Sequence, residues 1–397
     1  MKLIGKLRAG PALWVGLAAL LASLDPMSAA QPSVHALQRG LKTGYYSFNG
    51  YPQDVKVTGS RAYVVTSSGS LAVFDVSTPT NLVYVGGYQF PGSATGLRVA
   101  LSADHAFMTL RSFGFFAINI RNPSNCVWVS SCNTGGWASD IALAGNHAYV
   151  ANGRAGLRIV DVRNPTNCVA VGAFYTGGWA EGVAVAGNYA YLADGNLGLQ
   201  VIDVSDPANC VLADSCATSG YAIGVAVSGN YAYVVDSNTG LNIIDVSIRT
   251  NCVRVGGHFT DRDAHSVVVS GNRAYVANGE SGLWVIDVTN PTNCVLLGRH
   301  DTSGRAYGVT VADARIYVAD SFGGLLVLPT LPNVQFTVRV DAATNQPFTL
   351  EAATDLSGTG NWSPLVTTNV PAMPFDFVDF DVKLTEKPRK FYRVRQP

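Results

Sequence analysis

A segment of 13 residues recurs along this chain of 397 residues at a fixed interval. Four clear copies read "GLRIVDVRNPTNC", "GLQVIDVSDPANC", "GLNIIDVSIRTNC" and "GLWVIDVTNPTNC". Their aspartates are 42 residues apart, at Asp161, Asp203, Asp245 and Asp287. Looser copies place Asp75, Asn119 and Pro329 at the same position, and only the step from Asp75 to Asn119 is longer, at 44 residues. A constant period of roughly 20–50 residues indicates a repeat protein.

Each repeat contains four segments with the character of short strands. In residues 180–221 these are "EGVAVAG", "YAYLAD", "GLQVIDVS" and "CVLADSCATSG", separated by Gly-Asn, "GNLG" and "DPAN" turns. Four antiparallel strands in about 42 residues is the size of one propeller blade. The pattern predicts seven blades, because inner hairpins should start near seven residues: Asp54, Gly96, Asp140, Gly182, Gly224, Ser266 and Gly308.

The last repeat stops at "GLLVLP", which leaves the seventh blade without a fourth strand. The missing strand is expected at the other end of the chain. Residues 41–55, "LKTGYYSFNGYPQDV", align without gaps on residues 169–183, "VAVGAFYTGGWAEGV", with Gly44 on Gly172. The N-terminal segment should therefore close the ring, which removes an open sheet edge. The predicted fold is an all-β, seven-bladed propeller.

The "GLxVIDVSxPxN" core and the "GNxAYVA" hairpin resemble the LVIVD-repeat proteins, a family of exported or surface β-propellers found mainly in bacteria. The resemblance covers roughly residues 35–330 and implies a secreted or cell-surface propeller. It implies no activity, because the family is not defined by a shared catalytic site. After Leu331 the period ends, and a tail containing "FTLEAATDLSGTGNWSPL" and "FYRV" looks like the small C-terminal β-module of secreted verrucomicrobia-type proteins. About five strands are expected there.

The first 30 residues have the pattern of an export signal. Lys2, Lys6 and Arg8 precede the apolar run "PALWVGLAALLASL", and "SAA" offers small residues for cleavage before Gln31. The apolar run is short for a membrane span, although an uncleaved anchor is the alternative. We therefore predict a signal peptide at 1–30, a propeller at 31–330 and a C-terminal module at 331–397. The expected location is secreted, periplasmic or on the outer cell surface, with no membrane span after cleavage.

Charge and motifs exclude several classes of function. The chain has 27 basic and 27 acidic residues, only 14% charged residues in all, so it lacks the basic footprint that binds nucleic acid or an anionic membrane. It contains no HExxH, GxSxG, Walker-type GxxxxGK or CxxC motif, and its six histidines share no metal-ligand spacing. We predict no cofactor, no metal and no catalytic residue.

The seven cysteines have a regular distribution. Five occupy one repeat position, and two more follow a repeat cysteine by six residues, in "CVWVSSC" and "CVLADSC". Six residues of regular strand span about 20 Å, so a local bridge would require the strand to fold back. The favoured interpretation is that the cysteines are small buried apolar residues. The local bridges Cys126–Cys132 and Cys210–Cys216 stay open as the alternative.

The repeated carboxylates are predicted to be structural. A residue that every blade requires is most simply part of the scaffold, and Asp side chains bond to nearby backbone N–H groups in turns. Asn119 takes the same position in one copy. An amide can replace the hydrogen-bond acceptor but not the charge, so a catalytic role is disfavoured.

The loops that join each fourth strand to the next blade share a frame but vary in composition. They read "NGYPQD", "PGSATG", "GGWASD", "GGWAEG", "SGYAIG", "DRDAHS" and "SGRAYG". In a propeller these loops approach the central channel on one side, which we call the channel face. Aromatic residues should cover one arc of it and charged residues another. The candidate ligand-binding residues are Tyr51, Asp54, Trp137, Asp140, Trp179, Glu181, Tyr221, Asp263, His265, Arg305 and Tyr307.

Aromatic rings beside a few polar groups suit a ligand with apolar faces and hydroxyl edges. The alternative is that these rings only pack between blades. We predict an exported, monomeric, non-enzymatic protein that binds carbohydrate or protein at the cell surface. A further alternative is an extracellular glycan-active hydrolase or lyase with acids drawn from Asp54, Asp140, Glu181 and Asp263. A pair of pKa-shifted carboxylates on the channel face would favour that enzyme.

Overall fold

The structure is a computed structural model that describes residues 44–46, 50–91, 94–261 and 263–330, together with five strands between residues 336 and 395. The chain divides into two compact units, one of residues 37–330 and one of residues 1–36 with 331–397. All regular elements in the described ranges are β-strands. These ranges contain no helix suited to cross a bilayer. The signal segment predicted for residues 1–30 lies outside them.

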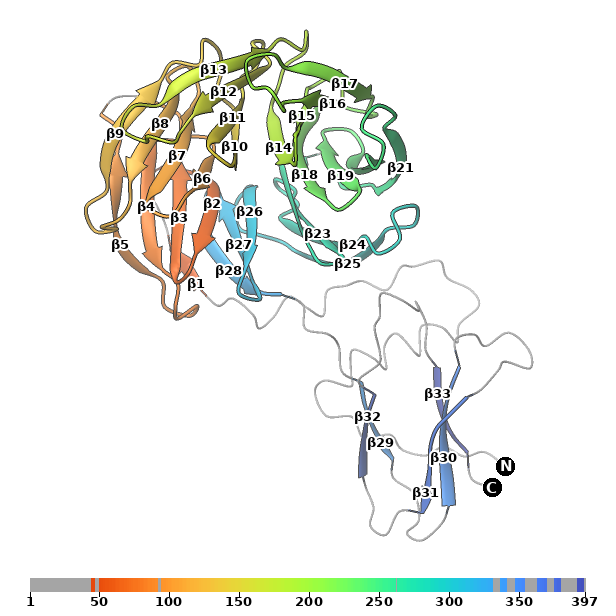
Figure 1. The fold of residues 1–397 in the computed structure, drawn as a ribbon. Helices are drawn as coiled ribbons and strands as arrows, with labels where there is room; N and C mark the ends of the chain where they lie inside the picture. Colours follow the sequence, from red (N-terminus) through yellow and green to blue (C-terminus); the bar gives the residue numbers. More distant parts are fainter. Residues whose placement is uncertain are drawn as a thin grey trace. The chain divides into compact units, whose positions relative to one another are not determined.

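Residues 50–330 form a ring of four-stranded antiparallel sheets, the blades of a propeller (Figure 1). Blade 1 is β2 (Pro52–Thr58), β3 (Arg61–Thr66), β4 (Ser70–Asp75) and β5 (Val83–Gln89), and blade 2 is β6 (Val99–Leu101), β7 (His105–Leu110), β8 (Gly114–Asn119) and β9 (Val127–Cys132). Blade 3 is β10 (Asp140–Ala144), β11 (His147–Ala151), β12 (Leu157–Asp161) and β13 (Val169–Phe174). Blade 4 is β14 (Gly182–Ala186), β15 (Tyr189–Ala193), β16 (Leu199–Asp203) and β17 (Val211–Cys216).

The remaining blades repeat this order. Blade 5 is β18 (Ala222–Ser228), β19 (Tyr231–Asp236), β20 (Gly240–Asp245) and β21 (Val253–His258). Blade 6 is β22 (Ser266–Ser270), β23 (Arg273–Ala277), β24 (Leu283–Asp287) and β25 (Val295–His300). Blade 7 contributes three strands in sequence, β26 (Ala306–Ala312), β27 (Arg315–Asp320) and β28 (Gly324–Pro329). The predicted seven blades are confirmed.

The fourth strand of blade 7 comes from the N-terminal side of the ring. β1 (Gly44–Tyr46) pairs antiparallel with β28, with Gly44 opposite Val327 and Tyr46 opposite Leu325. In Figure 1 this red strand lies beside the blue strands of blade 7. The predicted closure is confirmed: hydrogen bonds between the two ends of the propeller hold the ring shut and leave β28 paired on both sides.

Gly-Asn turns explain why the sequence folds into inner hairpins. Gly187 joins β14 to β15 and has φ of 59°, a left-handed conformation that glycine adopts without steric cost. A two-residue turn with glycine at its first central position matches the twist of the strands on either side. The next strand then pairs in register, with Ala186 opposite Tyr189.

The hydrophobic core lies between the blades. Each of the six hydrophobic clusters found among the described residues joins side chains of two neighbouring blades. One such cluster places Phe74 and Val64 of blade 1 against Tyr317 and Leu325 of blade 7. Fully burying a side chain of this size contributes about 1.5–3 kcal/mol, so blade stacking stabilises the ring. The closure therefore depends on packing as well as on β1.

The repeated carboxylates, with Asn119 in blade 2, cap the turn after the third strand of blades 1–6. Asp203 Oδ1 accepts a hydrogen bond from the Ser205 backbone N–H at 2.9 Å. Asn119 Oδ1 accepts the equivalent bond from Arg121 at 3.0 Å. The same bond to the N–H two residues later is made by Asp75, Asp161, Asp245 and Asp287. The predicted structural role is confirmed.

The C-terminal unit contains the expected five strands. β29 (Phe336–Val340) pairs with β32 (Phe375–Asp379) in a two-stranded sheet. β30 (Pro347–Ala353) is the central strand of a second sheet, between β31 (Ser363–Asn369) and β33 (Phe391–Arg395). All these pairings are antiparallel.

Candidate functional site

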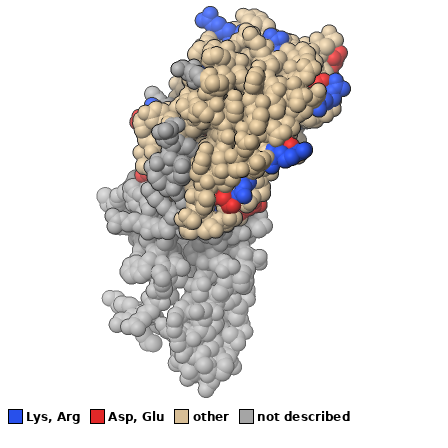
Figure 2. Space-filling model, turned by 90° about the vertical axis from the view of Figure 1, so that its left-hand side faces the viewer, with Lys and Arg blue, Asp and Glu red and all other residues tan. Residues whose placement is uncertain are grey.

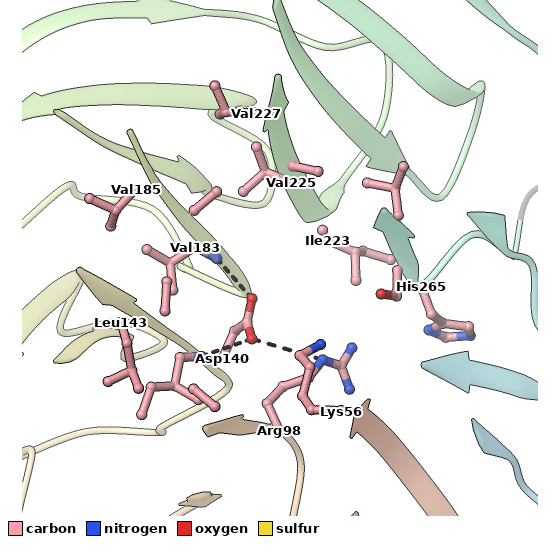
Figure 3. A pocket seen from close by; sticks show the side chains of 18 of the residues that line it. Lys56, Arg98, Asp140, Leu143, Val183, Val185, Ile223, Val225, Val227 and His265 are labelled. Carbon is pink, nitrogen blue, oxygen red and sulfur yellow. Dashed lines mark hydrogen bonds and ion pairs between the residues drawn. The ribbon is translucent and has the colours of Figure 1, made fainter. Parts of the chain in front are cut away.

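The inner strands of the blades surround a cavity of about 490 Å³ in the centre of the propeller. Its wall is formed by β2, β6, β10, β14, β18 and β22. Most of the lining is apolar and includes Leu143, Val185 and Val227, whereas four groups are charged or titratable: Lys56, Arg98, Asp140 and His265. Figure 3 shows Asp140 between Val183 on one side and Arg98 and Lys56 on the other, with His265 across the cavity.

Three consecutive blades place a charged residue at the same point of the inner strand. Val55, Val99 and Ile141 pair with the fourth residue of the second strand in blades 1, 2 and 3. The preceding residues, Asp54, Arg98 and Asp140, are therefore structurally equivalent. The expectation that the second inner hairpin starts near Gly96 is wrong by two residues, because blade 2 has two extra residues before β6.

These charged residues link neighbouring blades. Asp54 Oδ2 accepts a hydrogen bond from the Val99 N–H at 3.0 Å, and Asp140 Oδ2 accepts one from the Val183 N–H at 2.9 Å. Lys56 Nζ lies 3.4 Å from Asp54, and Arg98 Nε lies 4.0 Å from Asp140. Burial raises the pKa of Asp140, while Arg98 and the backbone donors oppose that rise. Each carboxylate therefore helps to hold two inner strands together.

Aromatic side chains from three successive loops form the aromatic arc, which consists of Trp137, Trp179 and Tyr221. The two indole rings are 6.2 Å apart and inclined by 58°, and 37% of Trp137 is exposed. The guanidinium groups of Arg111 and Arg154 lie 4.9 and 5.7 Å from the ring centres of Trp137 and Trp179. Such cation–π contacts orient the rings while leaving part of their surface accessible.

Glu181 contacts the aromatic arc through Tyr221. The Tyr221 hydroxyl donates a hydrogen bond to Glu181 Oε1 at 3.4 Å. Burial raises the pKa of Glu181, against the effect of the Ser139, Arg98 and Tyr221 groups around it. Burial and the Glu181 charge raise the pKa of Tyr221 to about 12, which keeps this hydroxyl protonated as a donor.

Arg111 adopts an unusual backbone conformation beneath the aromatic arc. Its φ is 27°, in a turn where the equivalent residues of blades 3, 4 and 6 are Gly153, Gly195 and Gly279. All four residues form the same isolated bridge with the loop that follows their blade. A side chain at this φ carries a steric cost that glycine avoids, and such residues often occur at binding sites.

The opposite side of the channel face carries the charged arc, which consists of Asp263, His265 and Arg305. Asp263 accepts hydrogen bonds from Arg305 Nη2 and His265 Nε2, each at 3.0 Å, and from the Glu280 N–H at 3.1 Å. Burial opposes the Asp263 charge, but these donors hold its pKa below the ordinary value. Burial lowers the pKa of His265, whose ring contacts Tyr307 edge to face at 4.8 Å.

The remaining two candidates have different surroundings. Tyr51 is exposed and packs edge to face on Phe322, with their ring centres 4.7 Å apart. Asp54 lies beneath the surface with 1% exposure, and both its oxygens have partners. Tyr51 is accessible to a ligand, whereas Asp54 is positioned to support the inner strands.

Sequence reasoning missed four basic residues of the channel and its face: Lys56, Arg98, Arg111 and Arg154. The 44-residue step between Asp75 and Asn119 was the signal for Arg98, because it marks the two extra residues. The turn "RSFG", where three other repeats have Asn-Gly or Asp-Gly, was the signal for Arg111. No cluster of three His, Cys, Asp or Glu side chains suited to a metal ion occurs in the described ranges.

The ring of seven four-stranded blades defines the protein as a β-propeller. Five segments match the family model for the LVIVD repeat: residues 49–89, 135–176, 177–218, 219–257 and 261–302. They cover just over half of the chain, which therefore belongs to the LVIVD-repeat family, as the resemblance implied.

Comparison with solved structures supports the fold. The computationally designed Ika8 protein is 9% identical with a TM-score of 0.55, over 73% of this chain and 100% of that chain. BamB from Moraxella catarrhalis is 16% identical with a TM-score of 0.53, over 72% of this chain and 85% of that chain. At such identities the likeness concerns the fold alone. A search of curated proteins gave no significant match.

Proposed function

We propose that this propeller is a non-enzymatic binding protein whose channel face engages a carbohydrate or protein ligand at the cell surface. The observation that carries the proposal is the asymmetry of the face, where two adjacent, partly exposed indoles lie opposite a hydrogen-bonded charged arc. A sugar ring offers apolar C–H faces to Trp137 and Trp179, and its hydroxyls suit the neighbouring carboxylate and guanidinium groups.

The strained turn at Arg111 supports the same proposal. Glycine would relieve the strain, yet arginine occupies the turn and places its guanidinium over Trp137. Natural proteins keep such strain mainly where a side chain has a task. Here that task is to fix the orientation of Trp137 on the channel face.

The chain's charge is consistent with a neutral or mixed ligand surface. On the side of the propeller shown in Figure 2, charged side chains are sparse and the two signs are interspersed. A large field of one sign, which would steer a polyanion to the protein, is not present on that side. We expect the protein to act as a monomer, since closure leaves the described blades without an unpaired outer edge at β28.

We further propose that the protein is exported, with cleavage before Gln31, and that residues 331–397 form the C-terminal module of secreted verrucomicrobia-type proteins. The pattern of the first 30 residues supports the first point and the tail motifs support the second. N-terminal sequencing of protein from its native host should begin at or near Gln31. An intact Met1 on cytoplasmic protein would contradict export.

The binding proposal is tested by screening the purified protein against a panel of polysaccharides, with binding and release of shorter products measured together. Binding to one class without product supports a binding protein. Loss of that binding in the Trp137→Ala and Trp179→Ala variants would assign it to the aromatic arc. If no polysaccharide binds, the carbohydrate part of the proposal is wrong.

A glycan-active hydrolase or lyase is the second candidate. It is favoured by one observation: burial raises the pKa values of both Glu181 and Asp140, carboxyls of adjacent loops at the channel. Glu181 is the better candidate for a general acid, because the Asp140 carboxylate already accepts hydrogen bonds from the backbone N–H groups of Ile141 and Val183. Product release that disappears in Glu181→Gln while binding persists would establish the enzyme and overturn the first proposal.

A further inference from the structure

The outer strand of each blade contacts the Pro-Asn loop of the next blade, and this contact brings distant cysteines together. Asp214 Oδ2, on β17 of blade 4, accepts a hydrogen bond at 2.6 Å from the backbone N–H of Cys252, which lies just before β21 of blade 5. Cys216 is two residues further along β17. Side chains two apart on a strand point to the same face, so Cys216 is directed toward the same loop.

Packing pairs these thiols in two places on the ring. Cys216 and Cys252 both pack against the hydrophobic cluster between blades 4 and 5. Cys132 and Cys168 both belong to the cluster between blades 2 and 3. The second place repeats the geometry of the first, because the Ser130 hydroxyl, two residues before Cys132, donates a hydrogen bond at 2.6 Å to the carbonyl of Pro165 in the facing loop.

The other three repeat cysteines face different residues. In the cluster between blades 1 and 2, the residue equivalent to Cys132 is Tyr88, which packs with Cys126. Between blades 3 and 4 it is Phe174, which packs with Cys210. On blade 5 the equivalent residue is His258, which pairs with Leu241 as Cys216 pairs with Leu199. The two additional cysteines of the sequence therefore occur only where they face a repeat cysteine of the next blade.

The environment of the Cys216 thiol differs from those of Cys126 and Cys294. The Cys252 thiol and the Arg254 backbone N–H donate to Cys216 and lower its pKa, although burial opposes them. Burial raises the pKa of Cys126 and of Cys294 to about 11. Cys216 consequently forms a thiolate more readily than Cys126 or Cys294, and thiolate is the reactive species in disulfide exchange.

All seven cysteines are free thiols in the structure. We propose that Cys216 with Cys252, and Cys132 with Cys168, are sites of disulfide formation that link neighbouring blades covalently. The two bonds use four cysteines and leave Cys126, Cys210 and Cys294 as thiols, which accounts for the odd number. These inter-blade bonds, rather than the local bridges Cys210–Cys216 and Cys126–Cys132, are the proposed alternative to a fully reduced protein.

The oxidant is a small-molecule disulfide such as oxidised glutathione. The Cys216 thiolate attacks one glutathione sulfur, forms a mixed disulfide and releases the other glutathione as a thiolate. Cys252 gives its proton to the released glutathione thiolate and attacks the Cys216 sulfur, which forms the inter-blade bond and releases the second glutathione. Two protein thiols are oxidised, and one glutathione disulfide is reduced to two thiols. The same exchange links Cys132 to Cys168.

The test is disulfide mapping of the full chain. Reduced, desalted protein is treated with oxidised glutathione, free thiols are blocked with N-ethylmaleimide, and the protein is cut before aspartate with endoproteinase Asp-N. This protease separates Cys210, in residues 206–213, from Cys216, in residues 214–235, and releases Cys252 in residues 245–260. We expect residues 214–235 joined to 245–260, and residues 104–139 joined to 161–193. Additional cleavage at Trp128 should assign the second bond to Cys132.

Matched variants test the pairing. Cys252→Ser should abolish the bond to Cys216 and leave the bond to Cys168, whereas Cys294→Ser should leave both. Oxidised wild-type protein should melt several degrees higher than reduced protein, because each bond restricts the unfolded chain, and Cys252→Ser should lose part of that rise. Residues 206–213 joined to 214–235, glutathione adducts without inter-blade bonds, or complete alkylation of all seven thiols would each overturn the proposal.

Discussion

The turn after each third strand and the loop into the next blade belong to the same repeat, yet they vary in opposite ways. The turns of blades 1–6 keep an aspartate or asparagine, and each one accepts the same hydrogen bond, as Asp203 does from Ser205 at 2.9 Å. The loops of the channel face hold indoles in one arc and an Asp–His–Arg cluster in another. A structural role that recurs from blade to blade requires the same residue type each time. One ligand at the centre of the ring would contact each blade from a different direction, so the residues that bind it differ between blades.

Blade 2 shows how the two kinds of position tolerate change. Asn119 replaces the repeat aspartate and keeps the capping bond, since only an acceptor is needed there. On the channel side of the same blade, two extra residues bring Arg98 to the position that Asp54 and Asp140 occupy in the neighbouring blades. The charge at this position therefore alternates in sign between blades 1, 2 and 3, and the contacts of these residues link the three blades. Scaffold positions vary conservatively, and channel positions change in chemistry.

The largest effect is expected from removing the scaffold's closure. Deletion of residues 31–48 removes β1 and leaves β28 with an unpaired edge and a partly uncovered blade 7. We expect aggregation or a large fall in Tm, measured by light scattering and calorimetry. A truncated protein that stays monomeric and melts like the parent would show that blade packing alone maintains the ring.

Truncating a buried tryptophan of the scaffold should have the next largest effect. Trp284 is 5% exposed and packs in the cluster between blades 5 and 6. Trp284→Ala should lower the free energy of unfolding by about 3–5 kcal/mol, as cavities of this size do. Chemical denaturation measures the loss. A cost below that of Trp137→Ala would contradict the distinction between core and face.

The tryptophans of the aromatic arc should affect binding rather than folding. Trp137→Ala and Trp179→Ala should each weaken the ligand identified by the polysaccharide panel by about 1–3 kcal/mol, with Tm nearly unchanged. Trp128→Ala is the matched control, because this indole is 48% exposed on β9, away from the channel. If both arc variants unfold readily and binding per folded molecule is unaffected, the aromatic arc only packs between blades and does not bind the ligand.

Acid should weaken the scaffold turns that depend on ionised carboxylates. Hydrogen bonds from Ser77 and from Arg163 lower the pKa values of Asp75 and Asp161 to about 2. An unfolded aspartate titrates near pH ~3.9, so the stabilisation is present above that pH and is lost as the pH falls toward about 2. Tm measured from pH 6 to pH 2 should fall mainly below pH ~4. A smaller fall is expected for Asp161→Asn, and an equal fall would exclude this carboxylate as a cause.

The smallest effect is expected at a single repeated carboxylate. Asp203→Asn keeps the acceptor for the Ser205 N–H, as Asn119 does for Arg121. Binding should be unchanged and the change in stability should be within about 0.5 kcal/mol at neutral pH, as for most surface substitutions. Isothermal titration and calorimetry test this together. A clear loss of binding would give the repeated carboxylates a function beyond the turn.

The 42-residue period was sufficient to predict the blades, their number, the closure by β1 and the capping role of Asp203 and its equivalents. These features depend on pairing between neighbouring strands, on turn residues and on the alternation of apolar and polar residues. All three can be recognised in short stretches of consecutive residues, and they recur from repeat to repeat. The composition of the loops also predicted that aromatic and charged residues separate into two arcs.

Only the tertiary structure decided which side chains meet across blades. Arg98 reaches the channel because an insertion shifts the register of one inner strand, and Asp54 is buried because the next blade covers it. The sequence left a local bridge between Cys210 and Cys216 open as an alternative, yet Cys216 lies beside Cys252, 36 residues later in the chain. Closing the ring brings outer strands against the loops of neighbouring blades, and contacts between residues so far apart in sequence leave no signal in the repeat itself.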